Sequence, residues 1–179
     1  MPRYVAFLRA INVGGHIVKM DELKRQFEKL GFEDVSTFIA SGNVVFSSPS
    51  KAVAGMETKI EAHLLKAFGY EVRTFVRSDA EVAAVAAYPV FNAQPFGDKG
   101  KLHVAFVADP IKAEGARKIM ALESRSDRFH VHGKEIYWLI DGGFSDSKLN
   151  NAGLEKAFGE RMTVRGINTV IRITAKYGF

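Results

Sequence analysis

Residues that can bind an anion occur in three short stretches of the sequence. They carry guanidinium, amide or hydroxyl groups, or form a glycine pair: Arg9, Asn12, Gly14, Gly15, Ser41, Asn43, Arg165, Asn168 and Thr169. Arginine makes bidentate hydrogen bonds to phosphate or carboxylate, while Asn, Ser and Thr supply directional donors. Two consecutive glycines allow a positive φ or a close backbone approach, and N–H groups near a helix N-terminus favour anions. If the end of the chain folds back on its beginning, these groups line one anion-binding cleft between two subdomains.

The same residues also have a purely structural interpretation. A double glycine is common in turns, and Ser41-Gly42-Asn43 has the composition of a tight turn. Arg165 can pair with a carboxylate instead of a ligand. The sequence leaves both interpretations open.

Signatures of known enzyme classes are absent from the sequence. There is no phosphate-binding G-x-x-x-x-G-K-[ST], no G-x-G-x-x-G and no G-x-S-x-G. Without cysteine there is no thiolate nucleophile, disulfide or cysteine-based zinc site. His130 and His132 alternate along one strand face, so with His103 they are conceivable metal ligands, although such pairs are more often plain surface residues. We predict no metal and no cofactor, and an enzyme whose groups converge only in space stays an alternative.

Positive charge is concentrated at the end of the chain. The net charge is +5, and from Lys148 onward six basic side chains stand against two acidic ones, an excess of +4. Such a segment can contact phosphates or simply be a solvated basic face. Nucleic acid is therefore the alternative partner, but the RNA-binding signature K/R-G-F/Y-G/A-F-V-x-F/Y is absent. The strand aromatics Phe38, Phe46 and Phe75 could stack on bases and are more often core residues.

Hydrophobic patterning indicates the elements that position these groups. In the first half, apolar runs predict strands at 4–8, 35–39, 44–46 and 72–76. Apolar side chains at helical spacing predict one helix from Met20 to Gly31 and another through Met56 and Phe68, ended by Gly69. The resulting order, β-α-β-β-α-β, is that of the split β-α-β plait.

The second half repeats this order up to its last element. Strands are expected at 102–107, 129–131 and 136–140, with helices after Asp109-Pro110 and from about 147 to 158. Helical spacing of Ile167, Val170 and Ile171 predicts a final helix whose start is undefined. We detect no residue-level repeat between the halves.

These patterns predict an α+β fold of two ferredoxin-like (α-β plait) subdomains in tandem, with antiparallel-rich sheets and helices packed on one face. The expected division is a subdomain at 1–77, a connecting helix and irregular loop at 78–100, and a second subdomain at 101–179. No stretch approaches the ~20 apolar residues of a membrane span. The first apolar run is too short for a signal peptide, so we predict a cytoplasmic protein without membrane contact.

Three stretches together resemble the domain-of-unknown-function family DUF1697, known from bacteria. They are residues 4–15, residues 37–46 and residues 163–170, together with Lys19-Met20 and Leu23. The resemblance implies two α-β plait subdomains and no established activity. The family pattern has glycine where Ala10 stands, and its tail reads Arg-Asn-Trp-Asn-Thr where this chain has residues 165–169 as Arg-Gly-Ile-Asn-Thr. From the chemistry of the candidate residues, and not from the resemblance, we expect a binding protein for an anionic, phosphate- or carboxylate-bearing ligand.

Overall fold

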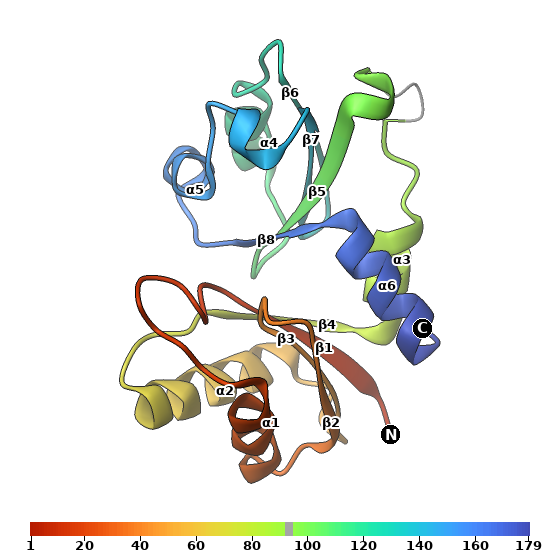
Figure 1. Cartoon of the computed structure of the whole chain (residues 1–179). Helices are drawn as coiled ribbons and strands as arrows, with labels where there is room; N and C mark the ends of the chain where they lie inside the picture. Colours follow the sequence, from red (N-terminus) through yellow and green to blue (C-terminus); the bar gives the residue numbers. More distant parts are fainter. Residues whose placement is uncertain (92–94) are drawn as a thin grey trace. The chain divides into compact units, whose positions relative to one another are not determined.

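The computed structural model describes residues 1–91 and 95–179 and divides them into two compact units (Figure 1). The first unit consists of Met1–Ala83 together with Tyr177–Phe179, and the second of Ala84–Lys176. Part of the irregular connection expected before residue 100 lies outside the described residues, namely 92–94. No helix of the described ranges is long and apolar enough to cross a membrane.

The first unit is a four-stranded antiparallel sheet with two helices on one face. Its elements are β1 (Arg3–Leu8), α1 (Met20–Lys29), β2 (Glu33–Phe38), β3 (Asn43–Ser47), α2 (Val53–Phe68), β4 (Thr74–Ser78) and the start of α3 (Asp79–Ala87). The strand order is β2-β3-β1-β4, and every pairing is antiparallel. The predicted β-α-β-β-α-β order is confirmed.

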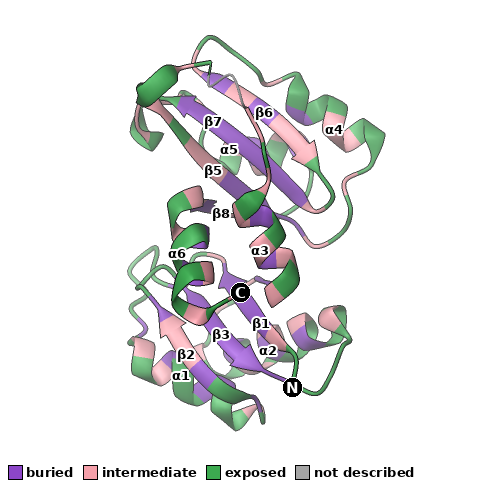
Figure 2. Cartoon of the chain, turned by 90° about the vertical axis from the view of Figure 1, so that its right-hand side faces the viewer, coloured by how far each residue is buried: buried purple, intermediate pink, exposed green. Residues whose placement is uncertain are grey.

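Apolar residues at helical spacing form one stripe along each helix, and this stripe is buried against the sheet. Leu23 and Phe27 of α1 and Ile60 and Leu64 of α2 are fully buried beside Phe46 of the sheet. Strands β1 and β3 are buried along nearly their whole length (Figure 2). This burial is expected, because both are central strands of the sheet and their sequences are short apolar runs.

The second unit has the same architecture. Its elements are η1 (Gly97–Lys99), β5 (Gly100–Phe106), α4 (Ala113–Met120), β6 (Asp127–His132), β7 (Glu135–Asp141), η2 (Phe144–Asp146), α5 (Asn151–Phe158), β8 (Thr163–Gly166) and α6 (Ile167–Tyr177). The order of its antiparallel sheet is β6-β7-β5-β8, with α4 and α5 packed on one face. The sequence-based expectation missed β8: the tail is a four-residue strand followed directly by the predicted helix.

The two sheets share their register residue by residue. Val5 of β1 pairs with Val45 on one side and with Arg77 on the other. Val104 of β5 correspondingly pairs with Tyr137 and with Arg165. This superposes residues 5–8, Val-Ala-Phe-Leu, on residues 104–107, Val-Ala-Phe-Val. The repeat is too short to recognise without the strand register, which is why none is detectable from the sequence alone.

The last three residues of the chain complete the first unit. The Tyr177 hydroxyl lies 2.6 Å from Ser36 Oγ on β2, and the Tyr177 ring makes an edge contact with Phe38. Arg3 Nη1 donates to the Tyr177 carbonyl at 2.7 Å, and its guanidinium lies over the Phe179 ring. The first and last segments of the chain are therefore parts of one packed unit.

A buried carboxylate ties together the loops of the second unit. Asp127 Oδ1 accepts hydrogen bonds of 2.7 Å from Trp138 Nε1 and from Ser147 Oγ. Asp127 Oδ2 accepts from Ser126 Oγ at 2.7 Å and from Ser124 Oγ at 3.0 Å. Burial alone would raise the pKa of Asp127, but these four donors outweigh it and hold the pKa below the ordinary value of 3.8.

The depressed pKa of Asp127 predicts acid-sensitive stability. The ionised carboxylate stabilises the fold above about pH 5, and this contribution is lost as the pH falls through about 4 towards the lower folded-state pKa. Asp127→Asn should lower the free energy of unfolding by about 1–3 kcal/mol at neutral pH and flatten its decline below pH 5. Urea denaturation followed by fluorescence of Trp138, the only tryptophan, measures both effects. Asp141→Asn, at the exposed end of β7, is the control, and equal acid dependence in both variants would contradict the assignment.

Candidate functional site in the first unit

Three loops meet at one end of the first sheet, because β1 and β2 end there while β3 and β4 begin there. We call this region, formed by residues 9–19, 39–42 and 69–73, the three-loop end. Asn12 Nδ2 donates to the Ala40 carbonyl at 3.1 Å, which joins the first two loops. The Arg9 N–H donates to Arg73 O, and the Tyr70 hydroxyl donates to Ile11 O, both at 2.8 Å. The region is thus held together by hydrogen bonds between residues distant in the sequence.

Asn12, predicted to contact a ligand, closes its own loop. While its amide nitrogen reaches Ala40, its Oδ1 accepts the backbone N–H of Val18 at 2.7 Å. Both ends of the side-chain amide therefore serve the loop. A structural role is sufficient to explain this residue.

The glycine pair forms a tight turn. Gly14 and Gly15 have φ values of 68° and 85°, and the His16 N–H donates to Val13 O at 3.4 Å. Positive φ at both central positions is the type I′ geometry, which strongly favours glycine. No atom outside the neighbouring residues lies within 4 Å of a Cβ built at either glycine. The glycines are therefore explained by the turn conformation and not by another part of the protein packing closely against them.

Ser41-Gly42-Asn43 makes the turn that its composition predicts. Asn43 is fully buried, and its Nδ2 donates to Phe38 O and to Ser41 Oγ, both at 2.9 Å. Gly42 has a φ of 80°, and a Cβ there would lie 2.8 Å from Ile11 Cγ2. Glycine is required at this position for conformation and for space.

Backbone strain marks both loops that Asn12 joins. Ala10 and Ile39 have φ values of 55° and 52°, in the left-handed region that non-glycine residues avoid. For Ile39 the β-branch makes the conformation a genuine outlier. Strained residues of this kind cost about 1–3 kcal/mol each and cluster at ligand sites.

The three-loop end contains three basic residues and one exposed acidic residue, Glu71. Arg9 is half-buried directly after β1, Lys19 is exposed, and Arg73 pairs with Glu61 at 3.1 Å. The exposed His16 ring stacks on Tyr70 with a centroid distance of 3.8 Å. Sequence reasoning missed His16 and Tyr70 as partners, because nothing in the pattern relates positions so far apart.

The other predicted site residues belong to the second unit. Arg165 on β8 is 8% exposed, and its Nη1 donates to Thr163 Oγ1 at 2.7 Å and to Val164 O at 2.9 Å. Burial lowers the pKa of Arg165 to about 10, which leaves the guanidinium charged at neutral pH. Asn168 and Thr169 lie in the first turn of α6, where Asn168 is exposed and Thr169 is half-buried.

The three histidines considered as metal ligands do not share a face. His103 pairs with Trp138, whose side chain lies in the core beneath the helices, and burial lowers the pKa of His103. His130 instead pairs with Tyr137 on the opposite face, where its Nε2 lies 2.9 Å from the Tyr88 hydroxyl. The hypothesis that His103, His130 and His132 bind one metal ion is therefore wrong, because His103 lies on the opposite face of the sheet from His130. The described residues contain no cluster of three or more side chains suited to a metal.

The strand aromatics are packed inside the protein. Phe46 lies in the core beneath the helices, while Phe38 and Phe75, at 6% and 1% exposure, are also buried. The core interpretation of these residues therefore agrees with the structure.

Comparison with known proteins identifies a family without an assigned activity. The sequence profile of "Protein of unknown function (DUF1697)" matches residues 1–137. Among solved structures, the chain is similar to the conserved bacterial protein SP0830 from Streptococcus pneumoniae, with a TM-score of 0.78 and 21% identity. The likeness covers 100% of this chain and 99% of that one, and at this identity it shows the fold alone. No curated protein matches the chain.

The strain at Ala10 predicts a stabilising substitution. Ala10→Gly relieves a left-handed alanine, worth about 1–2 kcal/mol, against a chain-entropy cost of about 0.5–1 kcal/mol. We expect a net gain of about 0.5 kcal/mol in the free energy of unfolding, measured by urea denaturation. Ala40→Gly, at an exposed position of the neighbouring turn without a positive φ, is the matched control and should destabilise. The strain assignment fails if both variants lose stability.

Proposed function

The chain belongs to the DUF1697 family of proteins of unknown function, and from that premise we propose that it is a binding protein for an anionic ligand. The ligand carries phosphate or carboxylate groups and is bound at the three-loop end. The supporting observation is the pair of strained residues, Ala10 and Ile39, in loops that hydrogen bonds hold together. Strain maintained in this way is a feature of preorganised binding loops.

The chemistry of the surrounding side chains favours an anion. Arg9 and Lys19 bring positive charge to the two ends of the first loop, and His16 adds a donor beside the exposed turn. The Ser41 hydroxyl stands on the adjoining turn and supplies a further polar group. A guanidinium together with an ammonium group and a hydroxyl on adjoining loops suits phosphate or carboxylate.

Arg9→Gln tests this function directly. We expect the variant to bind inorganic pyrophosphate and citrate at least about tenfold more weakly, because a charge-assisted hydrogen bond is lost. The measurement is a titration followed by 15N-resolved amide shifts of residues 9–19 and 39–42. Arg25→Gln on α1, whose guanidinium makes an exposed ion pair with Glu22, is the matched control.

Two outcomes would refute the proposal. One is the absence of saturable shifts with either probe, and the other is equal affinity of the two variants. Arg165, Asn168 and Thr169, which belong to the second unit, stay predicted anion-binding residues, and for them the prediction is that Arg165→Ala abolishes binding. Because Arg165 is buried, the fluorescence of Trp138 must first establish that this variant is folded.

Nucleic acid is the second candidate ligand. The observation in its favour is that five basic residues of the C-terminal segment are exposed: Lys148, Lys156, Arg161, Arg172 and Lys176. If they contact phosphates, binding of labelled single-stranded RNA should fall steeply with salt. Arg161→Gln should reduce the slope of log K against log[salt] by about 1. Fluorescence anisotropy at several salt concentrations measures this, and lack of binding at low salt would eliminate the candidate.

A further inference from the structure

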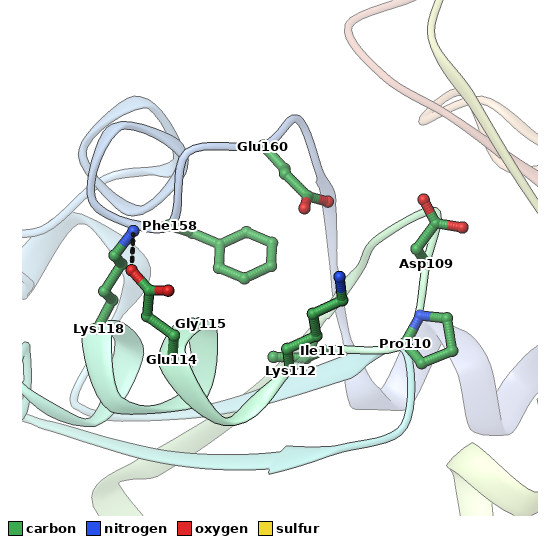
Figure 3. Close-up of a pocket in the computed structure, with 9 residues that line it drawn as sticks. All are labelled: Asp109, Pro110, Ile111, Lys112, Glu114, Gly115, Lys118, Phe158 and Glu160. Carbon is green, nitrogen blue, oxygen red and sulfur yellow. Dashed lines mark ion pairs between the residues drawn. The ribbon is translucent and has the colours of Figure 1, made fainter.

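A pocket lies in the second unit, between the turn that precedes α4 and the turn that follows α5 (Figure 3). Its volume is about 340 Å³, within the range of small-molecule sites. Phe158 and Ile111 supply apolar surface, and charged side chains surround it. None of the residues predicted from the sequence to bind a ligand lies in this pocket.

Close packing of α5 on α4 fixes the aromatic side of the pocket. A Cβ at Gly115 of α4 would lie 2.8 Å from Phe158 Cε2, so the ring occupies the space above a residue without a side chain. Phe158 is 8% exposed and belongs to the hydrophobic core of the unit. The ring is therefore held in place before any ligand arrives.

The charged side chains of the pocket are of mixed sign with an acidic excess. Glu114 and Lys118 form an ion pair of 3.3 Å along α4. Lys112 and Glu160 reach into the pocket from opposite sides, and Asp109 stands at a third side (Figure 3). The lining thus carries three carboxylates and two ammonium groups, one net negative charge. That balance disfavours a simple anion and favours a ligand with an excess positive charge.

We propose that this pocket binds a small zwitterion with one additional positive charge, the pattern of a free basic amino acid. The α-ammonium group pairs with Glu160, the carboxylate with Lys112, and the side-chain cation with Asp109. The ligand's hydrocarbon stem lies on the Phe158 ring, which supplies apolar contact. This site is separate from the three-loop end and does not depend on the function proposed there.

Amide shift titration with L-arginine tests the proposal on the intact chain. Saturable shifts are expected for residues 109–118 and 158–160 at millimolar concentration. Glu160→Gln should weaken binding by about three- to fivefold, the effect of losing one solvent-exposed ion pair. Glu28→Gln, at an exposed position of α1 in the first unit, should leave the affinity unchanged. Phe158→Leu should also weaken binding, and thermal unfolding verifies that this variant is folded.

Related probes separate the zwitterion from simpler ligands. Agmatine, which lacks the carboxylate, should bind more weakly than arginine, and Lys112→Gln should reduce that difference. The proposal is overturned if agmatine binds as tightly as arginine, or if inorganic phosphate shifts the same amides at lower concentration. It is equally overturned if arginine produces no saturable shifts, or if the two glutamate variants bind alike.

Discussion

The pairing of β1 with strands on both of its sides is the constraint on which the candidate site depends. Phe7 pairs with Asn43 of β3 and with Phe75 of β4, so the end of β1 and the beginnings of its two neighbours lie at the same end of the sheet. This is the three-loop end, where Asn12 donates a hydrogen bond to the Ala40 carbonyl. A slip of one residue would exchange the faces of every β1 side chain and move the loops apart. The site's geometry is therefore a consequence of sheet register.

The second unit uses the same register with different loops. Arg77 and Arg165 occupy corresponding positions, and each donates from Nη1 to the carbonyl of its preceding residue, Val76 or Val164. The loop after β5 corresponds to the glycine-containing loop after β1, but it is shorter and contributes Asp109 and Lys112 to a pocket. We thus propose an anion site at the loop after β1 and a site for a cationic zwitterion at the corresponding loop after β5. Such a difference is in keeping with function residing in the loops of a shared fold.

Local signals in the sequence predicted most of the elements and few of the contacts. Apolar runs and helical spacing located the strands and helices of the first unit, and Gly31 and Gly69 follow its helices with positive φ as expected. Strand β8 escaped prediction because only four residues form it and helical spacing begins directly afterwards. Turn chemistry explained Ser41-Gly42-Asn43, whereas the hydrogen bond from Tyr70 to Ile11 joins residues 59 apart. Such contacts depend on the strand register, which no short pattern contains.

The return of Tyr177–Phe179 to the first unit makes that unit discontinuous in sequence. Arg3 and Tyr177 are separated by 174 positions, so their hydrogen bond closes a loop that contains the whole second unit. During synthesis, which proceeds from the N-terminus, the sheet of the first unit can form well before the residues that complete it have left the ribosome. The first unit can therefore be completed only after the second unit has been synthesised.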